Sequence, residues 1–338
     1  MNPAIETTPH VLLVLGTGGT IAGSGVGAGA ASLEYVAGTV GVAELVRGAD
    51  APSGFVFHAE QVAQIDSKDM TLSIWRDLAD RCATALTDNS VGGIIITHGT
   101  DTIEETAFFL ASVFPSLTKP IVLTCAMRPA TALSPDGPQN LRDAVAVAVA
   151  SGISGVFVVC AGEIHDASYV RKSHPYRLNA FESGELGPVG YVEEGNPRLT
   201  RPATNAGNSS CNWKLISSID IADWPSVEIV TSFAGTRGRL VDILTRERES
   251  GAPNAVDGLI LAATGNGSLH EDLIAAALRA QTAGIEVWRA SRCLNGTIVP
   301  TSRDRFPHAG TLTPVKARIA LLLRLLTERS VAKSRQPA

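Results

Sequence analysis

The stretch that decides the fold is residues 93–114, GIIITHGTDTIEETAFFLASVF. It opens with Gly93–Thr97, an apolar, isoleucine-rich run of the length expected for a strand buried on both faces. A short loop, HGTDT, follows, and apolar side chains then recur at helical spacing through residues 102–114. A buried strand that passes through a loop into an amphipathic helix is the repeating unit of a parallel sheet covered by helices.

The same unit recurs on both sides of this stretch. In the first part of the chain we predict further strands at Val11–Leu15, Pro120–Thr124 and Gly155–Val159, and helices at Met70–Ala85 and Asn140–Ala150. After residue 223 the predicted strands are Ser226–Ser232, Gly258–Ala262 and Glu286–Arg289, and the predicted helices are Arg239–Glu249, His270–Ala283 and Pro314–Arg329. The alternation therefore predicts α/β structure from end to end.

The length of 338 residues favours two domains. Residues 198–223 are polar, lack a helical period and are longer than an ordinary internal connection, so we interpret them as a linker. We expect a large N-terminal catalytic domain over residues 1–197, with a mostly parallel, flavodoxin-like sheet. Residues 224–338 are expected to form a smaller α/β domain.

Composition narrows the classes of function. A net charge of -5 without a basic run argues against nucleic acid as a partner, and no apolar run is long enough to span a membrane. No export signal is visible, and five cysteines without a CxxC pair suggest reduced thiols, so we expect a cytoplasmic protein, or a periplasmic one if a signal was removed. The histidines lack metal-ligand spacing, so no metal is expected.

Threonines follow two of the predicted strands. Val11–Leu15 leads into a loop that ends at Thr20, and Gly93–Thr97 leads into the loop that holds Thr100. Because a hydroxyl needs a neighbouring base to become a nucleophile, Thr100, Asp101 and Lys172 are predicted to form a proton relay if the fold brings them together. The start of the second helix also predicts a capping box, of Thr102 with Glu105 or of Asp101 with Glu104.

Simpler readings of these residues stay open. Thr100 could serve only as a helix cap, and Lys172 only as a solvated side chain. The glycines of GSGVGAGA, residues 23–30, also suggest a phosphate-binding loop, but they lie well beyond the strand end at which that motif belongs.

Five sequence blocks together resemble the bacterial L-asparaginase and glutaminase-asparaginase family. They are GTGGTIAG, ITHGTDTIEETAFFL, CAMRPATALSPDGPQNLRDA, GPVGY and TGNGSL, and they extend in order over nearly the whole chain. The resemblance implies a two-domain amidohydrolase with a small-molecule amide substrate and no cofactor. It also implies a homotetramer of close dimers, in which the small domain of one subunit contributes to the active site of another.

The resemblance also implies roles for particular residues. Thr20 is the expected nucleophile, and Tyr35 is its partner, brought over the bound amide when a lid formed by Ile21–Leu33 closes. Thr100, Asp101 and Lys172 are the second catalytic group. Substrate-binding positions are expected at Gly19, Ser67, Lys68, Gly99 and Asp101, with Ser67 on the substrate carboxylate and backbone N–H groups on the oxyanion. The glycines of the lid, Gly25 and Gly27 among them, are expected to act as its hinge.

Three positions depart from the pattern of the family. Lys68 stands where the family usually has glutamine, Gly235 replaces an asparagine, and residues 303–305 (Arg-Asp-Arg) offer no clear counterpart of an acidic residue from the partner subunit. A lysine about 4 Å from a substrate ammonium group costs on the order of a few kcal/mol of binding at an effective dielectric constant near 20. Either Lys68 points away, paired with Asp101 or Asp69, or the preferred substrate has no free α-ammonium group. In the second case we expect a dicarboxylate monoamide or an asparagine derivative blocked at its amino group, and in the first an ordinary asparaginase.

Two functions of other classes remain as alternatives. The chain could be a ligand-binding or regulatory protein that keeps the fold with little turnover, because three recognition positions have changed. It could also be an amidotransferase subunit that passes ammonia to a partner, although it lacks a basic patch or an added RNA-binding domain.

Overall fold

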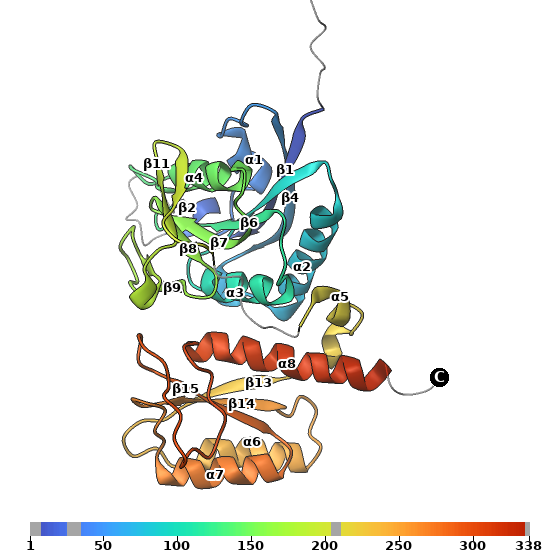
Figure 1. Ribbon diagram of the computed structural model, residues 1–338, viewed down its shortest axis with the longest axis vertical. Helices are drawn as coiled ribbons and strands as arrows, with labels where there is room; N and C mark the ends of the chain where they lie inside the picture. The colour runs from blue at the N-terminus through green and yellow to red at the C-terminus, as the bar shows by residue number, and fades with distance from the viewer. Residues whose placement is uncertain (1–7, 26–34, 204–210, 335–338) are drawn as a thin grey trace, which may run out of the picture. The chain divides into compact units, whose positions relative to one another are not determined.

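The computed structural model in Figure 1 describes residues 8–25, 35–203 and 211–334. The chain forms two compact units, residues 1–209 and 210–338, and each is described by itself. The division falls inside the segment 198–223 that the sequence suggests as a linker. That segment also contains the end of a strand and two short helical turns, α5 (Trp213–Ile216) and η4 (Ile221–Asp223).

The first unit is built on an eight-stranded sheet of order β12-β11-β8-β7-β6-β5-β1-β4. The strands are β1 (His10–Gly18), β4 (Phe55–Ile65), β5 (Val91–Thr97), β6 (Pro120–Thr124), β7 (Gly155–Cys160), β8 (Glu163–Asp166), β11 (Gly190–Glu193) and β12 (Asn196–Leu199). The pairs from β4 through β7 are parallel, and β8, β11 and β12 extend the sheet in antiparallel fashion. The predicted mostly parallel sheet is confirmed.

Helices cover both faces of this sheet (Figure 1). They are α1 (Val42–Arg47), α2 (Leu72–Thr87), α3 (Ile103–Val113) and α4 (Gly137–Val149). Side chains of α1 and α4 share one core cluster with Leu12, Ile95, Val122 and Phe157 of the strands, while α2 and α3 pack against each other and the sheet. The central strands are apolar throughout because both of their faces are covered.

The second unit repeats this design on a smaller scale. Its sheet has the order β13 (Val227–Thr231), β14 (Gly258–Ala263) and β15 (Glu286–Ser291), all parallel. The helices α6 (Arg239–Glu249) and α7 (Glu271–Thr282) pack on one face, and α8 (Pro314–Ser334) packs on the other (Figure 1). No helix among the described residues is long and apolar enough to cross a bilayer.

Candidate active site

The two glycine–threonine loops meet at the carboxyl edge of the large sheet. β1 and β5 are adjacent and parallel, with Gly16 opposite Thr97, so both loops leave the sheet side by side. Their backbones touch, because a β-carbon built on Gly19 would lie only 2.3 Å from the Cα of Gly99. Thr20 begins the turn η1 (Thr20–Ala22), and Thr20 and Thr100 are each only 6% exposed. The fold therefore brings two threonine loops, far apart in sequence, to one place.

Lys172 joins the second of these loops. Its Nζ lies 2.8 Å from the Thr100 Oγ1 and 2.6 Å from the Asp101 Oδ1. The lysine comes from the short strand β9 (Arg171–Lys172), which pairs with β10 (Phe181–Glu182), and its backbone N–H donates to Glu104 Oε2 at 2.6 Å. A hydroxyl, an amine and a carboxylate in mutual contact form a group that can hold and move a proton.

The segment after β4 locks onto the same loop. The Ser67 Oγ, nearly inaccessible to solvent, accepts a hydrogen bond of 3.2 Å from the Asp101 backbone N–H. The Thr102 hydroxyl donates to the Ser67 carbonyl oxygen at 2.7 Å. Ser67 is held against Gly99 as well, because a β-carbon on Gly99 would lie 2.5 Å from the Ser67 Oγ. Ser67, Gly19 and Gly99 thus lie together beside the threonines.

The predicted capping box is wrong. Thr102 is the N-cap residue of α3, but its side chain caps no helical N–H group and bonds to the Ser67 segment. The Asp101 carboxylate binds Lys172, and the Glu104 carboxylate accepts from the backbone of the same lysine. Side chains that could satisfy the helix terminus are used for contacts that build the site.

Lys68 is turned toward solvent. Its side chain is 62% exposed, and its Nζ pairs with the neighbouring Asp69 carboxylate. The hydrogen bond to Asp69 raises the pKa of the Lys68 ammonium group above its usual value. The sequence suggested Asp101 or Asp69 as the partner of Lys68, and the structure shows Asp69. The positive charge of Lys68 is therefore balanced by its neighbour in the chain.

The lid prediction is only partly covered by the described residues. Residues 26–34 and the Tyr35 side chain lie outside them. The ends of the segment form a small antiparallel pair, β2 (Ser24–Gly25) with β3 (Tyr35–Val36), in which Gly25 lies opposite Tyr35. The Gly25 N–H also donates to the Thr131 Oγ1 at 2.7 Å. The backbone of Tyr35 is thus held next to the chain that leaves Thr20.

In the second unit, the positions that depart from the family lie on exposed loops. Gly235 has a φ of 78°, and a β-carbon added there would meet nothing within 4 Å. Asp304 accepts hydrogen bonds from the Thr301 N–H at 3.0 Å and the Thr301 hydroxyl at 2.8 Å, and it pairs with Arg289. The bonds from Thr301 come first among the causes that lower the pKa of Asp304. This carboxylate is therefore already bound within its own unit.

The sequence reasoning did not single out His98, although it stands between β5 and Gly99. The ring is completely buried, and burial lowers its pKa to about 4. The Nδ1 lies 2.8 Å from the Gly99 carbonyl oxygen and the Nε2 lies 2.9 Å from the Thr106 Oγ1. A polar side chain at the end of an otherwise apolar strand was the signal that could have revealed it.

The buried neutral state of His98 predicts how stability depends on pH. The unfolded histidine takes up a proton below its ordinary pKa of 6.5, whereas the folded one does so only near pH 4. The contribution to stability is therefore present above pH 6.5 and is lost as the pH falls toward 4, by roughly 3 kcal/mol in total. Urea unfolding of the wild type and His98→Asn at pH 7.5 and pH 5 should show the stability gap between the two narrowing in acid. A constant gap would contradict a buried neutral histidine.

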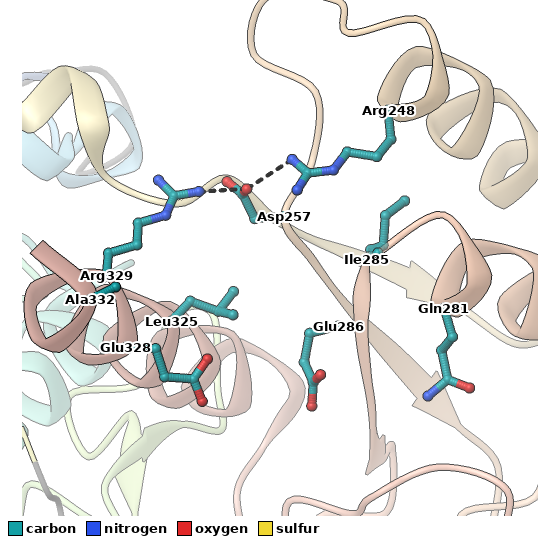
Figure 2. Close-up of a pocket in the computed structure, with 10 residues that line it drawn as sticks. Arg248, Asp257, Gln281, Ile285, Glu286, Leu325, Glu328, Arg329 and Ala332 are labelled. Atoms are coloured by element: carbon teal, nitrogen blue, oxygen red, sulfur yellow. Dashed lines mark hydrogen bonds and ion pairs between the residues drawn. The ribbon is translucent and has the colours of Figure 1, made fainter. Parts of the chain in front are cut away.

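A cavity of about 590 Å³ lies in the second unit (Figure 2). Figure 2 shows Arg248 and Arg329 both directed at Asp257, whose Oδ1 lies 3.0 Å and 2.5 Å from their guanidinium groups. Asp257 and Glu286 stand at the amino ends of β14 and β15. Because sites of parallel α/β sheets form at the carboxyl ends of strands, this cavity is a weaker candidate than the threonine loops, despite its size.

The fold and the threonine site together define an α/β enzyme that has a hydroxyl–amine–carboxylate group at the carboxyl edge of its larger sheet. The family model "Asparaginase, N-terminal" matches residues 11–205, and the model "Glutaminase/Asparaginase C-terminal domain" matches residues 226–336. The chain belongs to the asparaginase family, and it is an L-asparaginase-like amidohydrolase.

Individual relatives agree with this assignment. L-asparaginase 2 of Bacillus subtilis (strain 168) is 35% identical over 321 residues, which cover 92% of this chain and 81% of the relative. Glutaminase-asparaginase of Pseudomonas fluorescens biotype A is 35% identical over 325 residues, covering 93% and 86% of the two chains. A solved structure, described as a probable cytoplasmic L-asparaginase from Campylobacter jejuni, superposes with a TM-score of 0.84 at 31% identity over 96% of this chain and 99% of that one.

Proposed function

We propose that the protein hydrolyses the side-chain amide of L-asparagine or a closely related amide, and that Thr20 is its nucleophile. The observation that carries the proposal is the meeting of the Thr20 and Thr100 loops at Gly19 and Gly99, with Lys172 bound to Thr100. Relatives named L-asparaginase and glutaminase-asparaginase support this class of substrate. No cofactor is needed for the reaction proposed.

In the proposed reaction, the Thr20 Oγ1 attacks the carbon of the substrate amide. A C–O bond forms, the hydroxyl proton passes to a base, and the carbonyl oxygen becomes an oxyanion. The oxyanion collapses, the C–N bond breaks, and nitrogen leaves with a proton as ammonia. Water then attacks the acyl-enzyme and releases the acid and the Thr20 hydroxyl.

Thr100, Asp101 and Lys172 are proposed to manage the protons. Asp101 holds the Lys172 amine through a 2.6 Å contact, and the amine in turn reaches the Thr100 hydroxyl. A proton can pass along this group without a large movement, since each atom is already within hydrogen-bond distance of the next. Backbone N–H groups of the two loops are proposed to bind the oxyanion, which typically contributes about 3–4 kcal/mol per donor.

The specificity proposed is for a substrate with a free α-ammonium group. The case for a different substrate required an unpaired lysine in the pocket, and Lys68 is paired with Asp69 at the surface. Ser67, buried beside Gly99, is proposed to receive the substrate carboxylate together with backbone N–H groups next to it, whereas the negative charge of the Asp101 carboxylate suits the α-ammonium group. The alternative, a dicarboxylate monoamide or an N-acylated asparagine, rests on the same three departures from the family pattern.

A substrate panel tests the proposal. Ammonia release should give a kcat/KM for L-asparagine at least about tenfold above that for succinamate or N-acetyl-L-asparagine, because these lack the α-ammonium group and so lose roughly 1.4 kcal/mol or more of recognition. The rate with L-glutamine in the same assay gives the glutaminase side activity. A preference for succinamate would establish the alternative specificity. No turnover of any amide would favour a ligand-binding protein, and turnover only with a second protein would favour an amidotransferase subunit.

The active assembly is proposed to be a homotetramer in which residues of the second unit complete the site of a partner subunit. This proposal rests on the family resemblance, and sedimentation of the purified protein measures its oligomeric state directly.

A cytoplasmic location is proposed because the five cysteines are free and because the similar Campylobacter structure is described as a probable cytoplasmic L-asparaginase. Fractionation of the source cells checks the location.

A further inference from the structure

His98 makes two hydrogen bonds that the proposed reaction leaves unexplained. The ring lies at the end of β5, wholly buried, between the Gly99 carbonyl oxygen and the Thr106 hydroxyl of α3. Thr106 is equally buried and also contacts the indole of Trp75, on α2, with 2.9 Å between the Trp75 Nε1 and the Thr106 Oγ1. The indole is held in turn by stacking on Phe109, with ring centroids 5.0 Å apart. Four groups therefore form one continuous chain from α2 to the Thr100 loop.

The direction of this chain is fixed at both ends. The Gly99 carbonyl oxygen can only accept, so the neutral His98 ring carries its proton on Nδ1 and leaves Nε2 as an acceptor. An indole N–H can only donate, so the Thr106 oxygen accepts from Trp75, and the Thr106 hydroxyl proton goes to the His98 Nε2. One tautomer of His98 satisfies every group in the chain.

The bond to Gly99 sets the orientation of a peptide in the site. In a trans peptide the carbonyl and the following N–H point in opposite directions, so holding the Gly99 oxygen toward His98 turns the Thr100 N–H away from it. Among the described residues, that N–H has no acceptor. Glycine has the widest choice of backbone conformations, so the Gly99–Thr100 peptide needs an external partner to keep one orientation.

We propose that Trp75, Thr106 and His98 form a hydrogen-bond relay that positions the Gly99–Thr100 peptide for the reaction. His98 is a positioning residue, since it acts through Gly99 and Thr100 and does not itself touch the reacting atoms. The relay connects the buried faces of helices α2 and α3 to the loop that carries Thr100. The inference rests on the proposed function, because it assigns Thr100 to the reaction.

Two substitutions of His98 separate positioning from ordinary core packing. An asparagine amide nitrogen can take the place of Nδ1 and donate to Gly99, whereas a glutamine amide reaches only the place of Nε2. We expect His98→Asn to keep most of the kcat. We expect His98→Gln to lower kcat about threefold to tenfold, the range for one hydrogen bond, with KM within about twofold of the wild type.

The outcomes of this experiment decide the proposal. If both variants lose kcat equally, or if His98→Gln keeps it, the relay is overturned and His98 is only a packed core residue. If His98→Gln does not fold, Thr106→Val is used instead, because this variant keeps the histidine and removes the hydroxyl that its Nε2 contacts. The relay requires a lower kcat in Thr106→Val, and an unchanged kcat would overturn it. Thr100→Ala, measured beside them, tests the proposed function separately, because only a retained activity in that variant would refute the role of Thr100 itself.

Discussion

Thr20→Ala and Thr100→Ala are each expected to lower kcat for ammonia release about a thousandfold or more while the fold remains intact. Removing a nucleophile leaves only binding and oxyanion stabilisation, and residues that act as one catalytic unit lose comparable amounts when removed singly. Both residues are 6% exposed, and neither belongs to the apolar core cluster of the large sheet. Steady-state kinetics with a coupled ammonia assay, together with circular dichroism, measures the two effects.

Thr17→Val is the matched control for these variants. Thr17 lies near the end of β1, three residues before Thr20, and is also buried, but its hydroxyl donates to the Thr97 carbonyl oxygen of β5 at 3.0 Å. The loss of this buried hydrogen bond should cost about 1 kcal/mol of stability and change kcat only a few-fold. If Thr17→Val were as inactive as Thr20→Ala, the loss would reflect damage to the loop and the nucleophile assignment would fail.

The buried strands were predictable because their sequences carry a strong local signal. β6 (Pro120–Thr124) and α6 (Arg239–Glu249) have the predicted bounds, and β5 and β7 differ by at most two residues at an end. β4 was missed. It lies at the edge of the sheet, and His58 and Glu60 interrupt its apolar residues, so it lacks the continuous apolar run of a central strand.

Missing β4 also hid part of the site. Ser67 follows this strand directly, and its position beside Gly99 depends on β4 running parallel to β1. The meeting of Lys172 with Thr100 could not be predicted from spacing, because 72 residues separate them and the lysine sits on a two-residue strand without a local pattern. The sequence supplied the chemical types, while the contacts come from long-range pairing of strands and loops.

Gly19→Ala is expected to destabilise the protein and to impair catalysis. Gly19 has a φ of 76° and a ψ of -173°, a region that is essentially restricted to glycine and costs other residues roughly 1–3 kcal/mol. The added β-carbon would also lie 2.3 Å from the Gly99 Cα, so the two loops must separate. A shift of about 1 Å between catalytic groups can lower kcat on the order of a hundredfold.

Gly54→Ala separates the cost of backbone strain from the cost of the contact with Gly99. Gly54 also has a positive φ, of 81°, but a β-carbon added there would meet nothing within 4 Å. It should show the cost of backbone strain alone, about 1–3 kcal/mol of unfolding free energy with kcat unchanged. Gly19→Ala should lose a further 1–3 kcal/mol, roughly the cost of overpacking, and most of its kcat. Equal stability loss in the two variants, or a normal kcat in Gly19→Ala, would mean that the Gly19–Gly99 contact does not hold the threonine loops in register. A larger loss of stability and of kcat in Gly19→Ala would instead show that the direct backbone contact of Gly19 with Gly99, which leaves no room for a β-carbon on Gly19, sets the spacing of the two loops. That spacing determines the distance between Thr20 and the group formed by Thr100, Asp101 and Lys172.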